Sequence, residues 1–116
     1  MLQSATKLVR EVDRYLIEAG SRPIHTSELC EVFNVSRRTL HRVFVEVHDV
    51  PPITFMRRKR LGDARAALKA ANGPVMIRDI AIEHGFAELG RFAAAYRQMW
   101  GELPSQTLRR AQRRSK

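Results

Sequence analysis

Residues 29–36 read LCEVFNVS, and about fifty residues later residues 80–87 read IAIEHGFA, which echoes the first stretch in its apolar first residue, its small second residue and its turn residue. Each stretch is followed by apolar residues at helical spacing, and then by a short turn that ends in Pro52 in the first copy and Pro104 in the second. The second half of the chain therefore repeats the first.

Each of these stretches has the pattern of a helix-turn-helix. A small residue, Cys30 or Ala81, suits the place where two helices cross closely, and it stands four positions before Asn34 or Gly85. Asparagine and glycine both tolerate positive φ, which a sharp turn requires. In such a motif the first helix braces the unit and the second enters the major groove of DNA. Two copies in register predict a chain that binds DNA at two places.

Apolar residues recur at helical spacing along most of the chain, and no segment alternates with the period of a strand. We therefore expect an all-α fold in which two helix-turn-helix subdomains are joined by a long linker helix, with about seven helices in all. Four helices can be given approximate bounds. They are residues 3–19, 52–71, 77–84 and 88–100.

Local signals refine the helix ends. We expect Thr26 or Ser27 to cap the second helix and Ser36 to cap the third, because a hydroxyl at this position accepts a hydrogen bond from a free amide. A last helix opens at Pro104 and is expected to fray from Arg109 into a basic tail. The inner face of the sixth helix is expected to carry Leu89, Phe92, Tyr96 and Met99 or Trp100.

The predicted boundaries give four segments: residues 1–51 as the first subdomain, 52–72 as the linker helix, 73–110 as the second subdomain, and 111–116 as the basic tail. A helix of about twenty residues is about 30 Å long. One turn of DNA advances roughly 34 Å. The linker could therefore hold two reading helices in successive major grooves.

Composition supports an anionic partner and gives no sign of a membrane segment or a leader peptide. The formal net charge is +9, which favours a polyanion. No apolar run reaches the roughly 18 residues of a membrane helix. The single cysteine, Cys30, fits a reducing compartment, so we expect a cytoplasmic protein.

Neither a metal site nor an enzyme is expected. The four histidines (His25, His41, His48 and His84) are scattered, without paired ligand spacing. No glycine-rich phosphate loop follows a strand, so no nucleotide cofactor is expected. Nothing in the sequence indicates catalytic residues.

Three stretches, residues 35–44, 60–68 and 80–105, make nearly the whole chain resemble the DNA-binding domain of the AraC/XylS family of bacterial transcription regulators. The resemblance implies tandem helix-turn-helix units on a long helix. It also implies that the chain is the C-terminal domain of a longer regulator, with a short standalone regulator as the alternative. The sequence departs from the family pattern at Met76, which replaces a capping Ser or Thr, and at Asp49, which replaces glycine.

The resemblance places Arg38, His41 and Arg42 toward the groove as base-reading residues, since arginine binds guanine bidentately and histidine can donate to a base. In the second copy, Arg91 is the one comparable polar reader among small and apolar residues. Sequence reading is therefore expected mainly from the first unit. The arginines expected to contact phosphate are Arg37, Arg57, Arg58 and Arg97.

The predicted function is sequence-specific binding of double-stranded DNA in a bacterial transcription regulator. RNA polymerase is a candidate second partner, and we expect the isolated domain to be monomeric and the full-length protein to be able to dimerise. The alternative is a basic helical interaction or RNA-binding module without sequence-specific DNA readout. The repeated turn with polar residues directly after it favours DNA.

Overall fold

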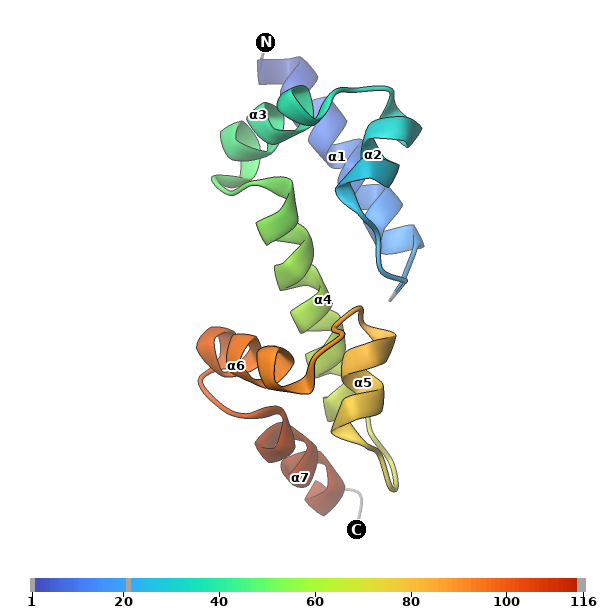
Figure 1. Ribbon diagram of the computed structural model, residues 1–116, viewed down its shortest axis with the longest axis vertical. Helices are drawn as coiled ribbons and strands as arrows, with labels where there is room; N and C mark the ends of the chain where they lie inside the picture. The colour runs from blue at the N-terminus through green and yellow to red at the C-terminus, as the bar shows by residue number, and fades with distance from the viewer. Residues whose placement is uncertain (1, 21, 115–116) are drawn as a thin grey trace. The chain divides into compact units, whose positions relative to one another are not determined.

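The computed structural model describes residues 2–20 and 22–114, and within them it contains seven α-helices and no strand (Figure 1). In chain order the helices are α1 (Leu2–Glu18), α2 (Thr26–Phe33), α3 (Arg37–His48), α4 (Pro52–Lys69), α5 (Ile77–Glu83), α6 (Leu89–Trp100) and α7 (Pro104–Arg114). The predicted all-α fold of two helix-turn-helix units is therefore confirmed.

The chain divides into two compact units, and the boundary falls inside α4, between Arg58 and Lys59. In the first unit, α1, α2 and α3 bury one apolar core, to which Met56 from the start of α4 contributes. In the second unit, the rest of α4 joins α5, α6 and α7 around another core. The helix expected as a separate linker thus contributes side chains to both cores.

The internal repeat extends beyond the two turns, because buried positions recur at a constant spacing of fifty-two residues along most of both units. The pairs from α1 and α4 are Val9 and Leu61, Val12 and Ala64, and Leu16 and Leu68. The pairs from the helices after each turn are Leu40 and Phe92, Phe44 and Tyr96, and Met56 and Leu108. The second half of α4 therefore takes the place in the second unit that α1 has in the first.

Two expectations about helix ends were wrong. Neither Thr26 nor Ser27 caps α2, because His25 takes the N-cap position in an extended conformation and provides no side-chain hydrogen bond. The last helix does not fray from Arg109 but continues to Arg114, since Thr107, Leu108 and Ala111 are buried at helical spacing along it. Residues 115–116 of the expected tail lie outside the described residues.

The expected inner face of α6 is correct for Phe92 and Tyr96, which are 0% exposed. Leu89 and Met99 do not belong to it, since they are 41% and 39% exposed. Trp100 instead packs at the edge of the second core. The buried stripe of α6 is therefore narrower than the sequence pattern indicated.

Candidate nucleic-acid interface

The turn of the first unit has the conformation that its sequence predicted. Asn34 is left-handed, with φ 53° and ψ 52°. The N–H of Val35 donates to the carbonyl of Cys30 at 3.0 Å, which closes the end of α2. Ser36 then begins α3, and its hydroxyl accepts from the N–H of Thr39 at 3.1 Å. A left-handed residue followed directly by a capped helix aims α3 sharply away from α2.

The second unit uses the same turn with one more residue. Gly85 has φ 86°, and the N–H of Phe86 donates to the carbonyl of Ala81 at 2.9 Å. The next helix then starts from Glu88, which provides no side-chain cap. The residues of α2 therefore match those of α5 at a spacing of fifty-one, whereas α3 and α6 match at fifty-two. The start of α6 is held less firmly than the start of α3.

Each helix that follows a turn is anchored by large apolar side chains on one face. Leu40 and Phe44 of α3 are 0% exposed, as are Phe92 and Tyr96 of α6. At their C-terminal ends, both helices stop at a left-handed residue, Asp49 with φ 61° and Gly101 with φ 76°. The opposite face of each helix is consequently the one available to a partner.

In each unit, a residue at the C-terminal end of the second helix of the helix-turn-helix contacts the helix that comes before the helix-turn-helix. The two contacts use equivalent positions of the repeat. In the first unit, Nε2 of His48 lies 3.3 Å from Oδ2 of Asp13 on α1. In the second unit, the guanidinium of Arg65 on α4 lies 4.4 Å from the centre of the Trp100 ring. The same two positions thus hold an Asp–His pair in one unit and a cation–π contact in the other.

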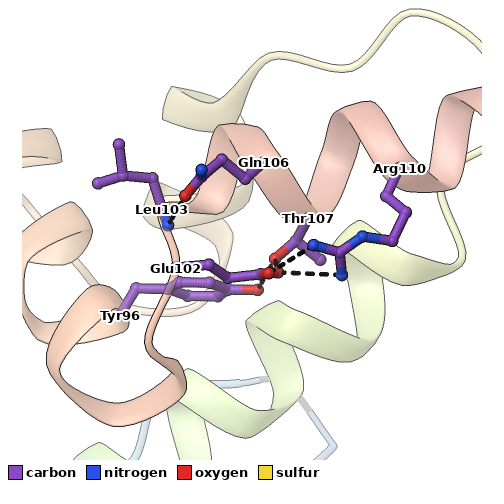
Figure 2. Close-up of polar contacts among 6 residues, drawn as sticks. All are labelled: Tyr96, Glu102, Leu103, Gln106, Thr107 and Arg110. Atoms are coloured by element: carbon purple, nitrogen blue, oxygen red, sulfur yellow. Dashed lines mark hydrogen bonds and ion pairs between the residues drawn. The ribbon is translucent and has the colours of Figure 1, made fainter.

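The polar end of Tyr96 is satisfied by α7 (Figure 2). Its hydroxyl donates to Oγ1 of Thr107 at 2.7 Å, and the Thr107 hydroxyl donates in turn to Glu102. Arg110 completes the network, with Nη2 at 2.6 Å from Oε1 of Glu102. Hydrogen bonds from Arg110 and Thr107 lower the pKa of Glu102, so the carboxylate stays ionised. The buried face of α6 is therefore fixed by packing and by a complete polar network.

The three base-reading residues predicted on the first unit lie together on the exposed face of α3. Arg38, His41 and Arg42 are all exposed, and their spacing places them on one side of the helix. Arg42 lies 3.3 Å from Glu46, but both side chains are largely solvated. Such surface pairs contribute little, so Arg42 can exchange this partner for a base at small cost.

The exposed face of α3 also carries an apolar residue that the sequence analysis did not single out. Val45 is 39% exposed and follows His41 by four positions and Arg42 by three. It therefore lies on the same side of the helix. In the sequence, Val45 lies outside the apolar stripe of this helix and, at helical spacing, among polar residues. This pattern could have identified it.

Arg91, the predicted reader of the second unit, is the most exposed of the ion-paired arginines, with 86% of its side chain accessible. Its Nε lies 3.0 Å from Oε2 of Glu88. In the fifty-two-residue register Arg91 matches Thr39, whereas Arg38, His41 and Arg42 match Gly90, Ala93 and Ala94. The exposed face of α6 thus combines one arginine with small residues.

The four arginines predicted to contact phosphate are all exposed: Arg37 on α3, Arg57 and Arg58 on α4, and Arg97 on α6. Arg37 lies in the first turn of α3, beside the base-reading residues of the same unit. Arg97 matches Val45 in the repeat and lies on the helix that carries Arg91. Within the described part of the chain these four arginines form no ion pair.

No described helix is long and apolar enough to cross a membrane. Residues 2–20 and 22–114 contain no group of three or more His, Cys, Asp or Glu side chains placed to hold a metal ion. His84, for example, is buried, and its Nδ1 lies 2.8 Å from the carbonyl of Ile80.

A family model described as a helix-turn-helix domain matches residues 29–110 of the chain. The XylDLEGF operon transcriptional activator of Pseudomonas putida is 36% identical over 103 residues, which are 88% of this chain and 32% of that protein. The probable thc operon regulatory protein of Rhodococcus erythropolis is 30% identical over 103 residues, 88% of this chain and 31% of that protein. The chain thus spans about a third of the length of these two relatives.

Solved structures with the same fold lead to the same group of proteins. A probable AraC family transcriptional regulator from Rhodopseudomonas palustris aligns with a TM-score of 0.82 and 35% identity, over 91% of this chain and 98% of that one. A transcriptional regulator with an AraC-type DNA-binding domain from Chromobacterium violaceum aligns with a TM-score of 0.77 and 26% identity, over 96% of each chain.

Proposed function

The chain belongs to the AraC/XylS family of transcription regulators, and from this premise we propose how its residues recognise DNA. Its function is DNA binding in transcription regulation. The family is one of DNA-binding domains and not of enzymes, and an RNA-binding or interaction module is not favoured. The observation that carries the detailed proposal is the cationic, exposed face of α3 directly after a capped turn.

In this proposal Arg38, His41 and Arg42 read base edges in a major groove. Their exposure and shared side of α3 support the assignment. Arginine can donate two hydrogen bonds to the O6 and N7 of guanine, which gives sequence discrimination as well as affinity. Val45, beside them, would pack against a thymine methyl group.

In this proposal the second unit contacts DNA bases through a different set of side chains. Arg91 would contact a guanine after releasing Glu88, and the exposed Leu89 and Ala94 would meet thymine methyl groups. One arginine among small residues supplies fewer discriminating hydrogen bonds than the set on α3. We therefore expect most sequence information to enter through the first unit.

Arg37, Arg57, Arg58 and Arg97 are proposed to contact backbone phosphates. Exposed arginines without a carboxylate partner lose little on moving to DNA, and each phosphate neutralised releases counterions. The affinity should accordingly fall with salt, with a log–log slope of about −0.9 for every phosphate contacted.

At the level of the whole chain, we propose that residues 1–51 and 73–110 bind successive major grooves and that residues 52–72 link them. The domain would work in the cytoplasm as a monomer, within a longer regulator that can dimerise. RNA polymerase is the proposed second partner, because the two relatives are named as an operon activator and an operon regulator. The chain spans about a third of the length of each of these relatives.

Replacement of Arg42 by alanine tests the reading role of α3. The target is a duplex selected by the wild-type protein from random DNA, and the measurement is the dissociation constant on this duplex and on unrelated duplexes. Loss of a bidentate contact should weaken binding to the selected duplex by about 1–3 kcal/mol and should relax the preference at one base pair. The effect on unrelated duplexes should be much smaller.

Arg14→Ala is the matched control, because it removes the same charge from an exposed position on α1. It should change binding to both kinds of duplex only slightly. An equal loss for Arg42→Ala on selected and unrelated duplexes would show that Arg42 contacts phosphate instead of a base.

A further inference from the structure

The second unit has a basic hollow between α4 and α7, with a volume of about 90 Å³. Six residues line it: Arg65, Lys69, Thr107, Arg110, Ala111 and Arg114. Four of these carry a positive charge and none carries a negative one. This volume is well below the roughly 300–1,000 Å³ of drug-sized ligand sites, so the hollow suits a small ion or a single charged group.

The positive charges of the basic hollow are only partly compensated. Glu102 balances Arg110, with 2.6 Å between Oε1 and Nη2. Lys69 and Arg114 have no ion pair within the described part of the chain. Like charges gathered in a partly enclosed space repel one another, and they raise the affinity of that space for anions.

Arg65 adds an observation that points to a ligand. Its guanidinium stacks on Trp100, and its Nε is buried without a hydrogen-bond partner. A buried N–H without an acceptor is costly, and Arg65 is one of the residues that line the hollow. Stacking on Trp100 also restrains the guanidinium before any ligand arrives, so less conformational freedom is lost on binding.

The basic hollow lies away from the face of α6 that is proposed to read DNA. Thr107 lines the hollow and accepts a hydrogen bond from Tyr96, whose ring lies on the fully buried face of α6 (Figure 2). Arg91 occupies the exposed face of the same helix. A phosphate of DNA bound to that face would therefore not enter the hollow.

We propose that the basic hollow binds a small oxyanion, a free phosphate or the carboxylate groups of a small organic acid, through Arg65, Lys69, Arg110 and Arg114. This site is additional to the DNA-binding surface and does not depend on which residues read bases. A bound anion would also compete with Glu102 for Arg110. The hollow is thereby connected through Thr107 and Tyr96 to the buried side of α6.

Titration of the full chain with inorganic phosphate tests the proposal. Binding is followed by NMR, through the Nε–H signal of Arg65 and the backbone amides of α4 and α7, at constant ionic strength maintained with sodium chloride. We expect saturable shifts with a dissociation constant on the order of 1 mM or tighter. A parallel titration with citrate distinguishes a phosphate site from a carboxylate site, and saturable binding of either supports the proposal.

Lys69→Gln and Arg114→Gln each remove a charge from the hollow without touching the Glu102 network. Each should weaken anion binding about tenfold, as expected for loss of a hydrogen bond to a charged group. Arg113→Gln is the matched control, since Arg113 is an exposed neighbour on α7 that does not line the hollow. Its affinity for the anion should match that of the wild type.

Two results would overturn the proposal. One is the absence of saturation with both anions, or an equal loss in Arg113→Gln, which would mean general charge attraction. The other is weaker binding of duplex DNA by Arg114→Gln than by Arg113→Gln together with no phosphate binding, which would assign the hollow to the DNA backbone. DNA affinity is measured separately, so failure here leaves the assignments on α3 unaffected.

Discussion

Ser36 is the residue that starts the helix proposed to read DNA. Its hydroxyl accepts from the N–H of Thr39 at 3.1 Å and donates to the Thr39 hydroxyl at 3.1 Å. Replacement by alanine leaves that amide without its intramolecular partner. We expect Ser36→Ala to lower the free energy of unfolding by about 1 kcal/mol. Urea denaturation followed by circular dichroism measures this change.

Ser27→Ala is the control for this substitution. Ser27 is an exposed serine in the first turn of α2, and it makes no cap. Its replacement should change the free energy of unfolding by less than about 0.5 kcal/mol, as is usual for surface positions. Equal destabilisation by both substitutions would contradict a specific role for the Ser36 cap.

Some properties of single residues could be predicted from the sequence and others could not. Positive φ was predicted for Asn34 and Gly85 from residue type alone, because few residues tolerate that conformation. The cap of α2 was assigned wrongly, because a hydroxyl near a helix start is compatible with several positions. Which position becomes the N-cap depends on where the backbone leaves the extended region, here at His25.

At the scale of elements, the junction of α1 and α2 contains a compact ionic cluster. Arg22 donates to both carboxylate oxygens of Glu28, at 3.1 and 2.8 Å, and the Tyr15 hydroxyl also donates to Glu28. The hydrogen bond from Arg22, followed by that from Tyr15, lowers the pKa of Glu28 to about 2. The same carboxylate raises the pKa of Tyr15 and of Arg22.

This cluster predicts a pH dependence of stability. The pKa of Glu28 is depressed in the folded chain, so the unfolded chain binds the proton more readily. The contribution of Glu28 is thus complete above its ordinary pKa of 4.5 and is lost as the pH falls toward about 2. Between these values, the urea midpoint of the wild type should fall more steeply than that of Glu28→Gln.

Glu31→Gln is the control for the pH experiment. Glu31 lies on the same helix and is exposed, and its side chain forms no ion pair within the described residues. Its variant should keep the acid dependence of the wild type. If Glu28→Gln also follows the wild-type curve from pH 4.5 to 2, the cluster does not stabilise the fold through this carboxylate.

Helices were predictable as elements, whereas their exact faces and mutual contacts were not. Apolar residues three and four apart identified α6, but the same spacing included Leu89, which is in the first turn and points outward. The contact of Arg65 with Trp100 joins helices that are distant in sequence. Periodicity within one helix carries no information about such a pair, so only the packed structure revealed it.

At the scale of the whole molecule, the two units share one scaffold and differ in the chemistry placed on it. In the first unit, the ring of Phe44 packs against that of Phe55, with ring centres 5.5 Å apart. The matching Tyr96 instead donates a hydrogen bond to Thr107, which matches Phe55. The sequence showed the repeat through its turns, but the polar network that replaces apolar packing appeared only when α6 and α7 were placed together.

This divergence predicts an asymmetric DNA site. Selection from random duplex DNA should yield two half-sites whose centres are separated by about one helical turn, roughly 10–10.5 base pairs. The half-site bound by α3 should be the more strictly specified. Arg38→Ala should relax base preference in that half only, and Arg91→Ala should relax at most one or two positions in the other.

The salt dependence of DNA binding distinguishes base-specific contacts from general electrostatic attraction. Removal of a phosphate contact, such as the one proposed for Arg57, should weaken binding to all duplexes alike. It should also reduce the log–log salt slope by about one. Arg38→Ala should leave that slope nearly unchanged while altering the selected sequence. Equal information in both half-sites, or a uniform loss of affinity for Arg38→Ala, would contradict the division of roles between the two units.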